Sequence, residues 1–159
     1  MRLDVTNLNF SYADKTIIKD LSFSVPDGAF ISILGPSGCG KSTLLNVLSG
    51  LLKPESGEIR IDGAPVHGTS RELAYMPQND LLFPWRTILD NVCLYGEIHH
   101  QKKEMRQMAL QQMARFGLAG CETKYPDELS GGMRQRAAFL RTTLCEAGIY
   151  LHTCHTGTE

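Results

Sequence analysis

Long apolar runs and an excess of charge of one sign are both missing from this sequence. A membrane-spanning helix needs about 20 consecutive apolar residues, and no segment of the 159 residues approaches that length. The polar start Met1-Arg2-Leu3-Asp4 differs from a signal peptide. A formal net charge of −1 gives no overall field to attract nucleic acid. We therefore expect a globular protein whose contact with any membrane is peripheral and whose partners include no nucleic acid.

Paired cysteines are missing as well. The five cysteines, Cys39, Cys93, Cys121, Cys145 and Cys154, are odd in number and include no C-x-x-C pair, so we expect reduced thiols, as in the cytoplasm. A metal site is the alternative use, because Cys154 lies between His152 and His155. These residues form a short polar tail with no further ligand group upstream, which disfavours that alternative.

The apolar content of 42% and the charged content of 21% are those of an ordinary globular domain, and the length favours one domain with one core. Apolar side chains alternate with polar ones at the start of the chain, which predicts antiparallel strands at the edge of a sheet. These alternating residues are Leu3, Val5, Leu8 and Phe10, and then Leu21, Phe23 and Val25. The nearly continuous apolar run at 30–34 predicts a central strand covered on both faces.

Helical spacing follows this run. Apolar residues recur at helical intervals after Lys41, so a helix is expected directly after the central strand. Two more strands are predicted at 58–63 and 73–76, and three helices at 88–94, 105–116 and 130–146. Met105, Met108 and Met113 indicate either an ordinary core or a plastic partner-binding surface, and the core is the commoner use. The expectation is an α/β fold.

A phosphate-binding loop is the most specific motif. The residues Gly35-Pro36-Ser37-Gly38-Cys39-Gly40-Lys41-Ser42 satisfy G-x-x-x-x-G-K-[ST] between the expected strand and helix. Glycines let backbone N–H groups approach phosphates, and the helix N-terminus adds partial positive charge. Lys41 is expected on the β- and γ-phosphates and Ser42 on Mg²⁺. A plain glycine-rich turn is the alternative, which the flanking elements disfavour, so we expect ATP or GTP binding.

Three further motifs follow in the order found in ABC ATPases. The segment Leu129-Ser130-Gly131-Gly132-Met133-Arg134-Gln135-Arg136 resembles the family's signature motif, in which the N-terminus of a helix suits a γ-phosphate. A serine-capped helix without a ligand is the alternative interpretation. Tyr12 lies where the family has an aromatic residue that stacks on adenine, and Gln78 where it has the Q-loop glutamine. The chain thus resembles an ABC ATPase, and the implied fold is a P-loop NTPase with an antiparallel β edge subdomain and a helical signature subdomain.

The resemblance also implies ligands and partners. ATP and Mg²⁺ are the implied cofactors, and two ATP-binding subunits would pair head to tail, so that the signature motif of one covers the nucleotide of the other. The stretch 80–92 is similar to importers of nitrate, sulfonates, taurine and pyrimidine precursors of thiamine. Their partners are a membrane-spanning permease and, indirectly, a solute-binding protein, so the chain is expected on the inner, cytoplasmic face of the membrane. Leu82, Phe83 and Trp85 are expected as exposed permease contacts, with local loop packing as the alternative.

The site residues implied by the resemblance form three groups. The nucleotide-binding residues are Tyr12, Gly35, Pro36, Ser37, Gly38, Cys39, Gly40, Lys41, Ser42 and Thr43; the signature residues are Leu129, Ser130, Gly131, Gly132, Met133, Arg134 and Gln135; the Mg²⁺ residues are Ser42 and Gln78.

The resemblance ends at about residue 151. The family's next strand ends in Asp-Glu, which holds Mg²⁺ and supplies the catalytic base, whereas this chain has Thr153 and Cys154 there, neither of which acts as a carboxylate. The D-loop and switch histidine are also missing, and neither His152 nor His155 replaces the latter. We expect a partial nucleotide-binding domain over 1–151, with a helical subdomain at about 79–130, a core sheet incomplete at the C-terminus and a non-matching tail at 152–159.

Three functions follow as hypotheses. The first is an ATP-binding importer subunit that, in full-length form, powers the transport of a small solute by ATP hydrolysis. The second is a truncated remnant that binds ATP without turnover or is nonfunctional, with residues 153–159 as an out-of-register tail from a frameshift or early stop. The third is an ABC ATPase of DNA maintenance, which needs a basic path for phosphates that the sequence does not show. An incomplete sheet also predicts marginal stability and aggregation.

Overall fold

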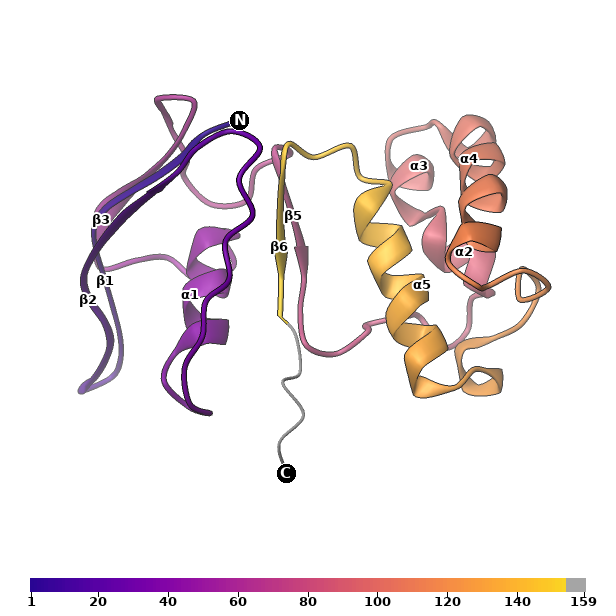
Figure 1. The fold of residues 1–159 in the computed structure, drawn as a ribbon, viewed down its shortest axis with the longest axis horizontal. Helices are drawn as coiled ribbons and strands as arrows, with labels where there is room; N and C mark the ends of the chain where they lie inside the picture. The colour runs from indigo at the N-terminus through magenta and orange to yellow at the C-terminus, as the bar shows by residue number, and fades with distance from the viewer. Residues whose placement is uncertain (154–159) are drawn as a thin grey trace. The chain divides into compact units, whose positions relative to one another are not determined.

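The chain divides into two compact units, Met1–Leu73 and the residues from Ala74 onward. The computed structural model describes residues 1–153. Within this range the first unit contains an antiparallel sheet and one α-helix, and the second contains short helices and a two-stranded sheet (Figure 1).

The sheet of the first unit confirms the expected antiparallel edge strands. β1 (Leu3–Tyr12) pairs antiparallel with β2 (Lys15–Val25) and β3 (Ser56–Ile61), and β4 (Ala64–Pro65) completes the order β2-β1-β3-β4. The register shifts between Val5 and Leu8, where Asn7 takes a left-handed φ of 50°. This bulge returns Leu8 to the buried face although it follows Val5 by three residues.

Helix α1 (Lys41–Leu48) lies beside this sheet (Figure 1). Leu44, Leu45, Val47 and Leu48 are buried, as the helical spacing predicted. The N-cap is Gly40, and no side chain accepts a hydrogen bond from the first turn. The backbone N–H groups at the start of α1 thus lack a side-chain acceptor at the position of the phosphate-binding loop.

The predicted central strand at 30–34 is wrong. Residues 29–36 form neither helix nor strand, and Phe30, Ile31, Ile33 and Leu34 are 94%, 53%, 41% and 79% exposed. A strand covered on both faces needs neighbouring strands to pair with its backbone groups, and none of the described strands pairs with this segment. The apolar run is therefore suited to burial by its side chains, but no described residues cover it.

The second unit is mainly helical, as the sequence predicted for residues after 78. β5 (Leu73–Met76) pairs with β6 (Ile149–His152). Between them lie α2 (Ile88–Val92), α3 (Leu94–Ile98), α4 (Lys102–Arg115), a 3₁₀ turn η1 (Pro126–Glu128) and α5 (Gly131–Thr143). α2 and α4 both pack against α5. One apolar core joins these helices and includes Met76, Ile88, Met113 and Leu140.

The methionines of α4 are divided between core and surface. Met105 and Met113 are 2% and 0% exposed, so the core interpretation is confirmed for these two. Met108 is 37% exposed because it lies at the flank of the buried stripe formed by Met105, Ala109 and Met113.

The remaining sequence predictions concern the C-terminal tail, the cysteines, a metal site and membrane-spanning helices. Of the predicted tail at 152–159, residues 154–159, including Cys154 and His155, lie outside the described residues, whereas His152 ends β6 and Thr153 follows it. Cys39, Cys93, Cys121 and Cys145 are free thiols, and residues 1–153 contain no cluster of His, Cys, Asp and Glu suited to a metal ion. No helix in that range is long and apolar enough to cross a membrane. The partial domain at 1–151 with a helical subdomain at about 79–130 stays a prediction.

Candidate functional site

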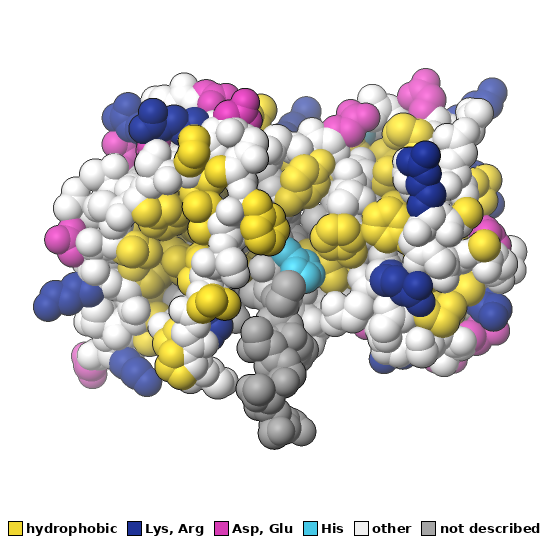
Figure 2. All heavy atoms as spheres, viewed as in Figure 1, with side chains coloured by type: hydrophobic (Ala, Val, Ile, Leu, Met, Phe, Trp, Pro, Cys, Tyr) yellow, Lys and Arg dark blue, Asp and Glu magenta, His cyan; other side chains and the backbone are white. Residues whose placement is uncertain are grey.

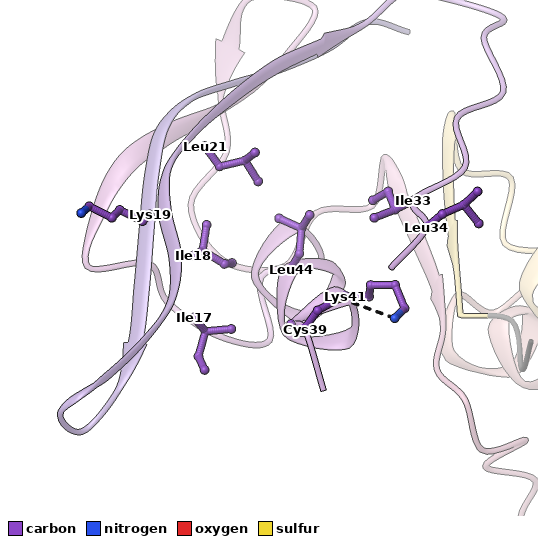
Figure 3. Close-up of a pocket in the computed structure, with 10 residues that line it drawn as sticks. Ile17, Ile18, Lys19, Leu21, Ile33, Leu34, Cys39, Lys41 and Leu44 are labelled. Atoms are coloured by element: carbon purple, nitrogen blue, oxygen red, sulfur yellow. Dashed lines mark hydrogen bonds between the residues drawn. The ribbon is translucent and has the colours of Figure 1, made fainter. Parts of the chain in front are cut away.

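The phosphate-binding loop holds the ammonium group of Lys41 with its own backbone. Lys41 Nζ donates to the carbonyl oxygen of Gly35 at 2.6 Å and to that of Pro36 at 2.8 Å, and it lies 3.6 Å from Cys39 Sγ (Figure 3). The loop closes through a hydrogen bond from the Cys39 N–H to the Pro36 carbonyl at 3.3 Å. The three donors of the ammonium group thus meet two carbonyl oxygens and the weak acceptor Cys39 Sγ, and these contacts orient the positive charge within the loop.

Two glycines give the loop its shape. Gly38 and Gly40 have φ angles of 79° and 98°, in the left-handed region that side chains disfavour. A Cβ atom on Gly40 would also lie 2.7 Å from Cγ2 of Ile17 on β2, whereas one on Gly38 would meet nothing within 4 Å. Gly40 is therefore required by both backbone conformation and packing, and Gly38 by conformation alone.

An apolar hollow lies beside the loop. Its walls come from β2, from α1 and from the unpaired segment before the loop, through Ile17, Ile18, Leu21, Leu44, Ile33 and Leu34. Figure 3 shows Ile17, Ile18 and Leu21 pointing from β2 toward α1, while Lys19 points away. Cys39, Gly40 and Lys41 of the phosphate-binding loop also line the hollow, so the hollow is continuous with the loop at its edge.

The other predicted nucleotide-binding residues also lie in the first unit. Ser42 and Thr43 follow Lys41 in the first turn of α1, with Ser42 exposed and Thr43 half-buried. Tyr12 ends β1 and is 49% exposed. Its ring packs edge-to-face on Phe10, with 4.9 Å between ring centroids and 87° between planes. The Tyr12 ring thus has a fixed support and a solvent-accessible surface.

The signature segment begins α5 as predicted. Ser130 is the N-cap, and its Oγ accepts a hydrogen bond from the Met133 N–H at 3.3 Å. Leu129 is buried at 4% exposure, whereas Gly131 and Gly132 are exposed. A Cβ on Gly132 would meet nothing within 4 Å. Neither packing nor a left-handed φ within the described residues requires glycine at position 132, although glycine destabilises a helix relative to alanine.

Helix α5 is bonded to the loop that carries Gln78. Gln135 Nε2 donates to the carbonyl oxygen of Gln78 at 3.2 Å. Arg134 Nε donates to Asp80 Oδ2 at 3.1 Å, while its Nη1 donates to the Leu129 carbonyl at 2.9 Å. The predicted signature residues and the predicted Q-loop residue are therefore brought together within the second unit.

Arg141 forms a second connection between α5 and the loop after Gln78, and the sequence analysis did not predict it. Its Nη1 and Nη2 donate to the carbonyl oxygens of Leu81 and Asp80, both at 2.8 Å. Burial lowers the pKa of Arg141 from its ordinary value, but a guanidinium group stays charged in proteins. Arg141 follows Arg134 by seven residues and therefore lies on the same face of α5, which is the signal that could have identified it.

Asn91 anchors the loop before α2 and was also missed. It is 0% exposed. Its Oδ1 accepts from the Phe83 N–H at 2.7 Å, and its Nδ2 donates to the carbonyls of Phe83, Arg86 and Thr87 at 3.1, 3.1 and 3.0 Å. The sequence did contain a sign of this role, because Asn91 is a polar residue on the apolar face of the helix predicted at 88–94. One buried amide thus fixes the turn on which Trp85 lies.

The predicted permease contacts are corrected in part. Leu82 is buried at 8% exposure and belongs to the apolar core, so its prediction as an exposed contact is wrong. Leu81 is 58% exposed instead, because its left-handed φ of 47° turns the chain and directs the next leucine inward. Trp85 is 70% exposed, as predicted, and its ring lies 5.2 Å from that of half-buried Phe83.

Thr153, at the position of the expected aspartate, is bonded to β5. Its N–H and its Oγ1 hydroxyl both donate to the Met76 carbonyl, at 3.2 and 3.3 Å. A hydroxyl donor to a backbone carbonyl carries no negative charge for a cation. Cys154, at the position of the expected catalytic base, lies outside the described residues.

Comparisons with known proteins cover both motif-bearing segments. A sequence model of the ABC transporter family matches residues 18–152. The uncharacterized ABC transporter ATP-binding protein YtlC of Bacillus subtilis is 46% identical over 140 residues, which are 87% of this chain and 54% of YtlC. The formylaminopyrimidine import ATP-binding protein ThiZ of Halalkalibacterium halodurans is 45% identical over 151 residues, covering 94% and 58%. The taurine import ATP-binding protein TauB of Yersinia pestis is 39% identical over 150 residues, covering 94% and 59%.

A solved structure agrees with these matches. The structure of an ATP-binding subunit of an ABC transporter superimposes with a TM-score of 0.83 at 25% identity and covers 96% of this chain and 65% of that chain. The chain therefore has the fold expected from the resemblance and spans a little over half the length of the curated relatives it matches. On the family match and these identities, the chain belongs to the ABC transporter family.

Proposed function

We propose that this chain binds MgATP at the phosphate-binding loop and that, within a full-length subunit, this binding serves ATP-driven import of a small solute. The orientation of Lys41 carries the proposal. Its ammonium is held by the Gly35 and Pro36 carbonyls at the start of a helix whose first N–H groups have no side-chain cap. A positive charge and free backbone donors beside left-handed glycines fit a nucleotide phosphate.

The neighbouring residues are assigned by the same proposal. The Ser42 hydroxyl would ligate Mg²⁺, with Gln78 as a further Mg²⁺ residue, and the half-exposed Tyr12 ring would stack on the adenine. Gly131 and Gly132, open to solvent at the start of α5, would cover the nucleotide of a second ATP-binding subunit in a head-to-tail pair.

The loop at 81–86 is proposed as the contact with a membrane-spanning permease. Trp85 and Leu81 are its exposed apolar side chains, and Asn91 holds the loop backbone in place. Exposed aromatic side chains on an ordered support are typical of interface centres. The subunit would then lie on the cytoplasmic face of the membrane, and a solute-binding protein would deliver the solute to the permease.

The transported solute is proposed only as a class. ThiZ is named for formylaminopyrimidine import and TauB for taurine import. Both names describe small polar solutes, and we propose a solute of that kind for a full-length importer built on this chain.

A second candidate function is nucleotide binding without turnover. Thr153 stands at the predicted carboxylate position, and its hydroxyl donates to the Met76 carbonyl. Phosphoryl transfer from ATP relies on carboxylates that hold Mg²⁺ and orient water. The chain by itself is therefore expected to bind ATP and to release no phosphate.

Fluorescence titration with an N-methylanthraniloyl ATP analogue and Mg²⁺, together with a phosphate-release assay, tests both candidates. Lys41→Ala removes the oriented charge and should weaken binding by about tenfold or more, since about 1.4 kcal/mol corresponds to each factor of ten. Lys53→Ala is the matched control, because Lys53 is an exposed lysine of the same unit outside the loop.

Each result distinguishes the candidates. Loss of binding in Lys41→Ala alone, with no phosphate release from the wild type, supports nucleotide binding without turnover by this chain. Phosphate release that depends on Lys41 supports a complete ATPase and overturns the role given to Thr153. Equal binding by wild type, Lys41→Ala and Lys53→Ala overturns the proposed nucleotide site.

A further inference from the structure

A thiol and an amine lie in contact inside the phosphate-binding loop. Lys41 Nζ lies 3.6 Å from Cys39 Sγ, and Figure 3 shows both side chains beside the start of α1. In Figure 2 the Lys and Arg side chains of the visible face lie mostly apart from one another. Lys41 has a more specific environment, because its nitrogen is held beside a sulfur atom that oxidants can attack.

Backbone groups of the loop hold this contact in place. The carbonyl oxygens of Gly35 and Pro36 accept hydrogen bonds from Lys41 Nζ at 2.6 and 2.8 Å. The sulfur lies over Gly35, since a Cβ atom there would be 2.8 Å from Cys39 Sγ. Groups held at contact distance react far faster than the same groups free in solution. The loop therefore keeps the amine in a position from which it can react with the sulfur.

Cys39 is also the described thiol that is most open to oxidation. It is exposed, whereas Cys93 and Cys121 are buried and Cys145 is half-buried. Burial raises the pKa of Cys93 to about 11 and also raises the pKa of Cys145, which keeps both thiols protonated. Peroxide reacts with the thiolate form of accessible cysteines. Among the four described thiols, Cys39 is therefore expected to be oxidised first.

The group that can react with an oxidised Cys39 is an amine. Peroxide converts a thiol to a sulfenic acid, which condenses with a neighbouring thiol or nitrogen. Cys39 is the sole cysteine of the unit Met1–Leu73, so that unit contains no second thiol for a disulfide. Lys41 Nζ is the side-chain nitrogen in contact with the sulfur. The loop thus pairs an accessible thiol with a nitrogen nucleophile.

We propose that Cys39 and Lys41 form a reversible redox switch, in which hydrogen peroxide links Cys39 Sγ to Lys41 Nζ through a sulfenamide (S–N) bond. Peroxide first transfers one oxygen atom to the thiol, which gives a sulfenic acid and water. The neutral amine of Lys41 then attacks the sulfur. The S–N bond forms as the S–O bond breaks, and the departing hydroxide takes a proton from the nitrogen and leaves as water. The sulfur loses two electrons, and the peroxide gains them.

The bond switches off nucleotide binding, a consequence that rests on the proposed function of Lys41. A sulfenamide nitrogen is uncharged and stays tied to Cys39, so the loop loses the positive charge that it offers to a phosphate. A thiol reductant restores both side chains. One thiol attacks the sulfur and releases the amine, and a second thiol then reduces the mixed disulfide and releases Cys39.

Mass spectrometry of the full chain of 159 residues tests the bond itself. After treatment with hydrogen peroxide, a peptide that contains Cys39 and Lys41 should lack two hydrogen atoms relative to the reduced chain. Trypsin should no longer cleave after Lys41, because it requires a free lysine side chain. Dithiothreitol should reverse both changes. Cys39→Ser should prevent them, and Cys145→Ser, at a half-buried thiol in the other unit, is the matched control that should retain them.

Fluorescence titration with the N-methylanthraniloyl ATP analogue tests the effect of the bond on binding. Peroxide should weaken binding by the wild type and by Cys145→Ser about tenfold or more, a change of about 1.4 kcal/mol or more, and dithiothreitol should restore it. Treated and untreated Cys39→Ser should bind with equal affinity, whatever that affinity is. Circular dichroism of each variant checks that the chain still folds.

Three results would overturn the proposal. The first is a treated wild-type chain whose Cys39 carries added oxygen without a bond to Lys41, and the second is a bond that dithiothreitol does not break. The third is unchanged analogue binding by the linked chain when Lys41→Ala binds more weakly than the wild type. Failure of the proposed function gives a different pattern, in which the bond forms but untreated wild type and Lys41→Ala bind the analogue equally.

Discussion

Glycine has a different physical role at Gly40 and at Gly132. Gly40 has a φ of 98°, and a Cβ there would lie 2.7 Å from Ile17 Cγ2. Gly132 lies in the first turn of α5 without a left-handed φ, and a Cβ there would meet nothing within 4 Å. The chain therefore requires glycine at the first position and tolerates a side chain at the second.

The same substitution should consequently have opposite effects at these two positions. Gly132→Ala should raise the free energy of unfolding by about 0.5 kcal/mol, because alanine favours the helix and loses less backbone entropy. Gly40→Ala should lower it by about 1 kcal/mol or more, because alanine disfavours a positive φ and meets β2. Urea unfolding of both variants gives the two values, and a loss of stability in Gly132→Ala would mean that the open space seen at α5 is filled in solution.

A single buried amide is expected to carry much of the order of the loop around Trp85. Asn91→Ala leaves the Phe83 N–H and three carbonyl groups without their side-chain partner. The free energy of unfolding should fall by about 2 to 3 kcal/mol, because unsatisfied buried groups are costly. Asn79→Ala is the control at an exposed asparagine. Thermal and urea unfolding measure the difference, and equal stabilities of the two variants would contradict the anchoring role.

The sites of residues that belong to a fixed sequence motif were predictable. The sites of residues that bond to backbone carbonyl groups were not. Lys41 and Ser130 each follow a fixed pattern of neighbours, and the structure places one in the loop and the other as N-cap of α5. Asn91 and Arg141 bond to carbonyl groups, which every residue has and which no sequence pattern distinguishes. Leu82 was wrongly predicted to be exposed because Leu81 has a left-handed φ. Such a φ is usually marked in a sequence by glycine, and Leu81 gives no such sign.

Elements whose ends are set by neighbouring residues in the sequence were predicted with accurate bounds. The strand at 73–76 and the start of α2 after Thr87 are confirmed, because a following proline and a capping hydroxyl act within a few residues. The strand at 30–34 failed for the opposite reason. Its apolar side chains indicate burial, but burial requires other strands, and the described residues contain none that pairs with it. A sequence pattern indicates whether a segment is suited to burial. Only the structure shows whether other described residues bury it.

The attachment of α5 to the loop at 80–81 gives a prediction at the scale of elements. Arg141→Met removes two hydrogen bonds of 2.8 Å to the Asp80 and Leu81 carbonyls. The amides of residues 80–83 should then exchange about tenfold faster, with a loss of about 1 to 2 kcal/mol in the free energy of unfolding. Arg141→Lys should restore only part of the protection, since an ammonium lacks the planar fork of arginine. Hydrogen exchange with mass spectrometry resolves this segment.

An exposed arginine elsewhere in the second unit provides the control for this experiment. Arg115→Met changes an exposed side chain at the end of α4 and should leave exchange at 80–83 unchanged. Equal exchange in Arg141→Met and Arg115→Met would show that the loop is ordered without the guanidinium.

For the whole molecule, the exposed apolar segment determines the expected behaviour in solution. Phe30, Ile31, Ile33 and Leu34 are all at least 41% exposed, and exposed apolar segments with unpaired backbone promote aggregation. The chain alone should therefore bind the dye 8-anilinonaphthalene-1-sulfonate and scatter light increasingly with concentration. Phe30→Glu should raise the concentration at which scattering begins by about threefold or more, since a charge at such a segment opposes association, whereas Leu51→Glu should have a smaller effect. A wild-type chain that stays monomeric and melts sharply and reversibly would show that this segment is covered in solution, and the incomplete sheet would then not limit the stability of the molecule.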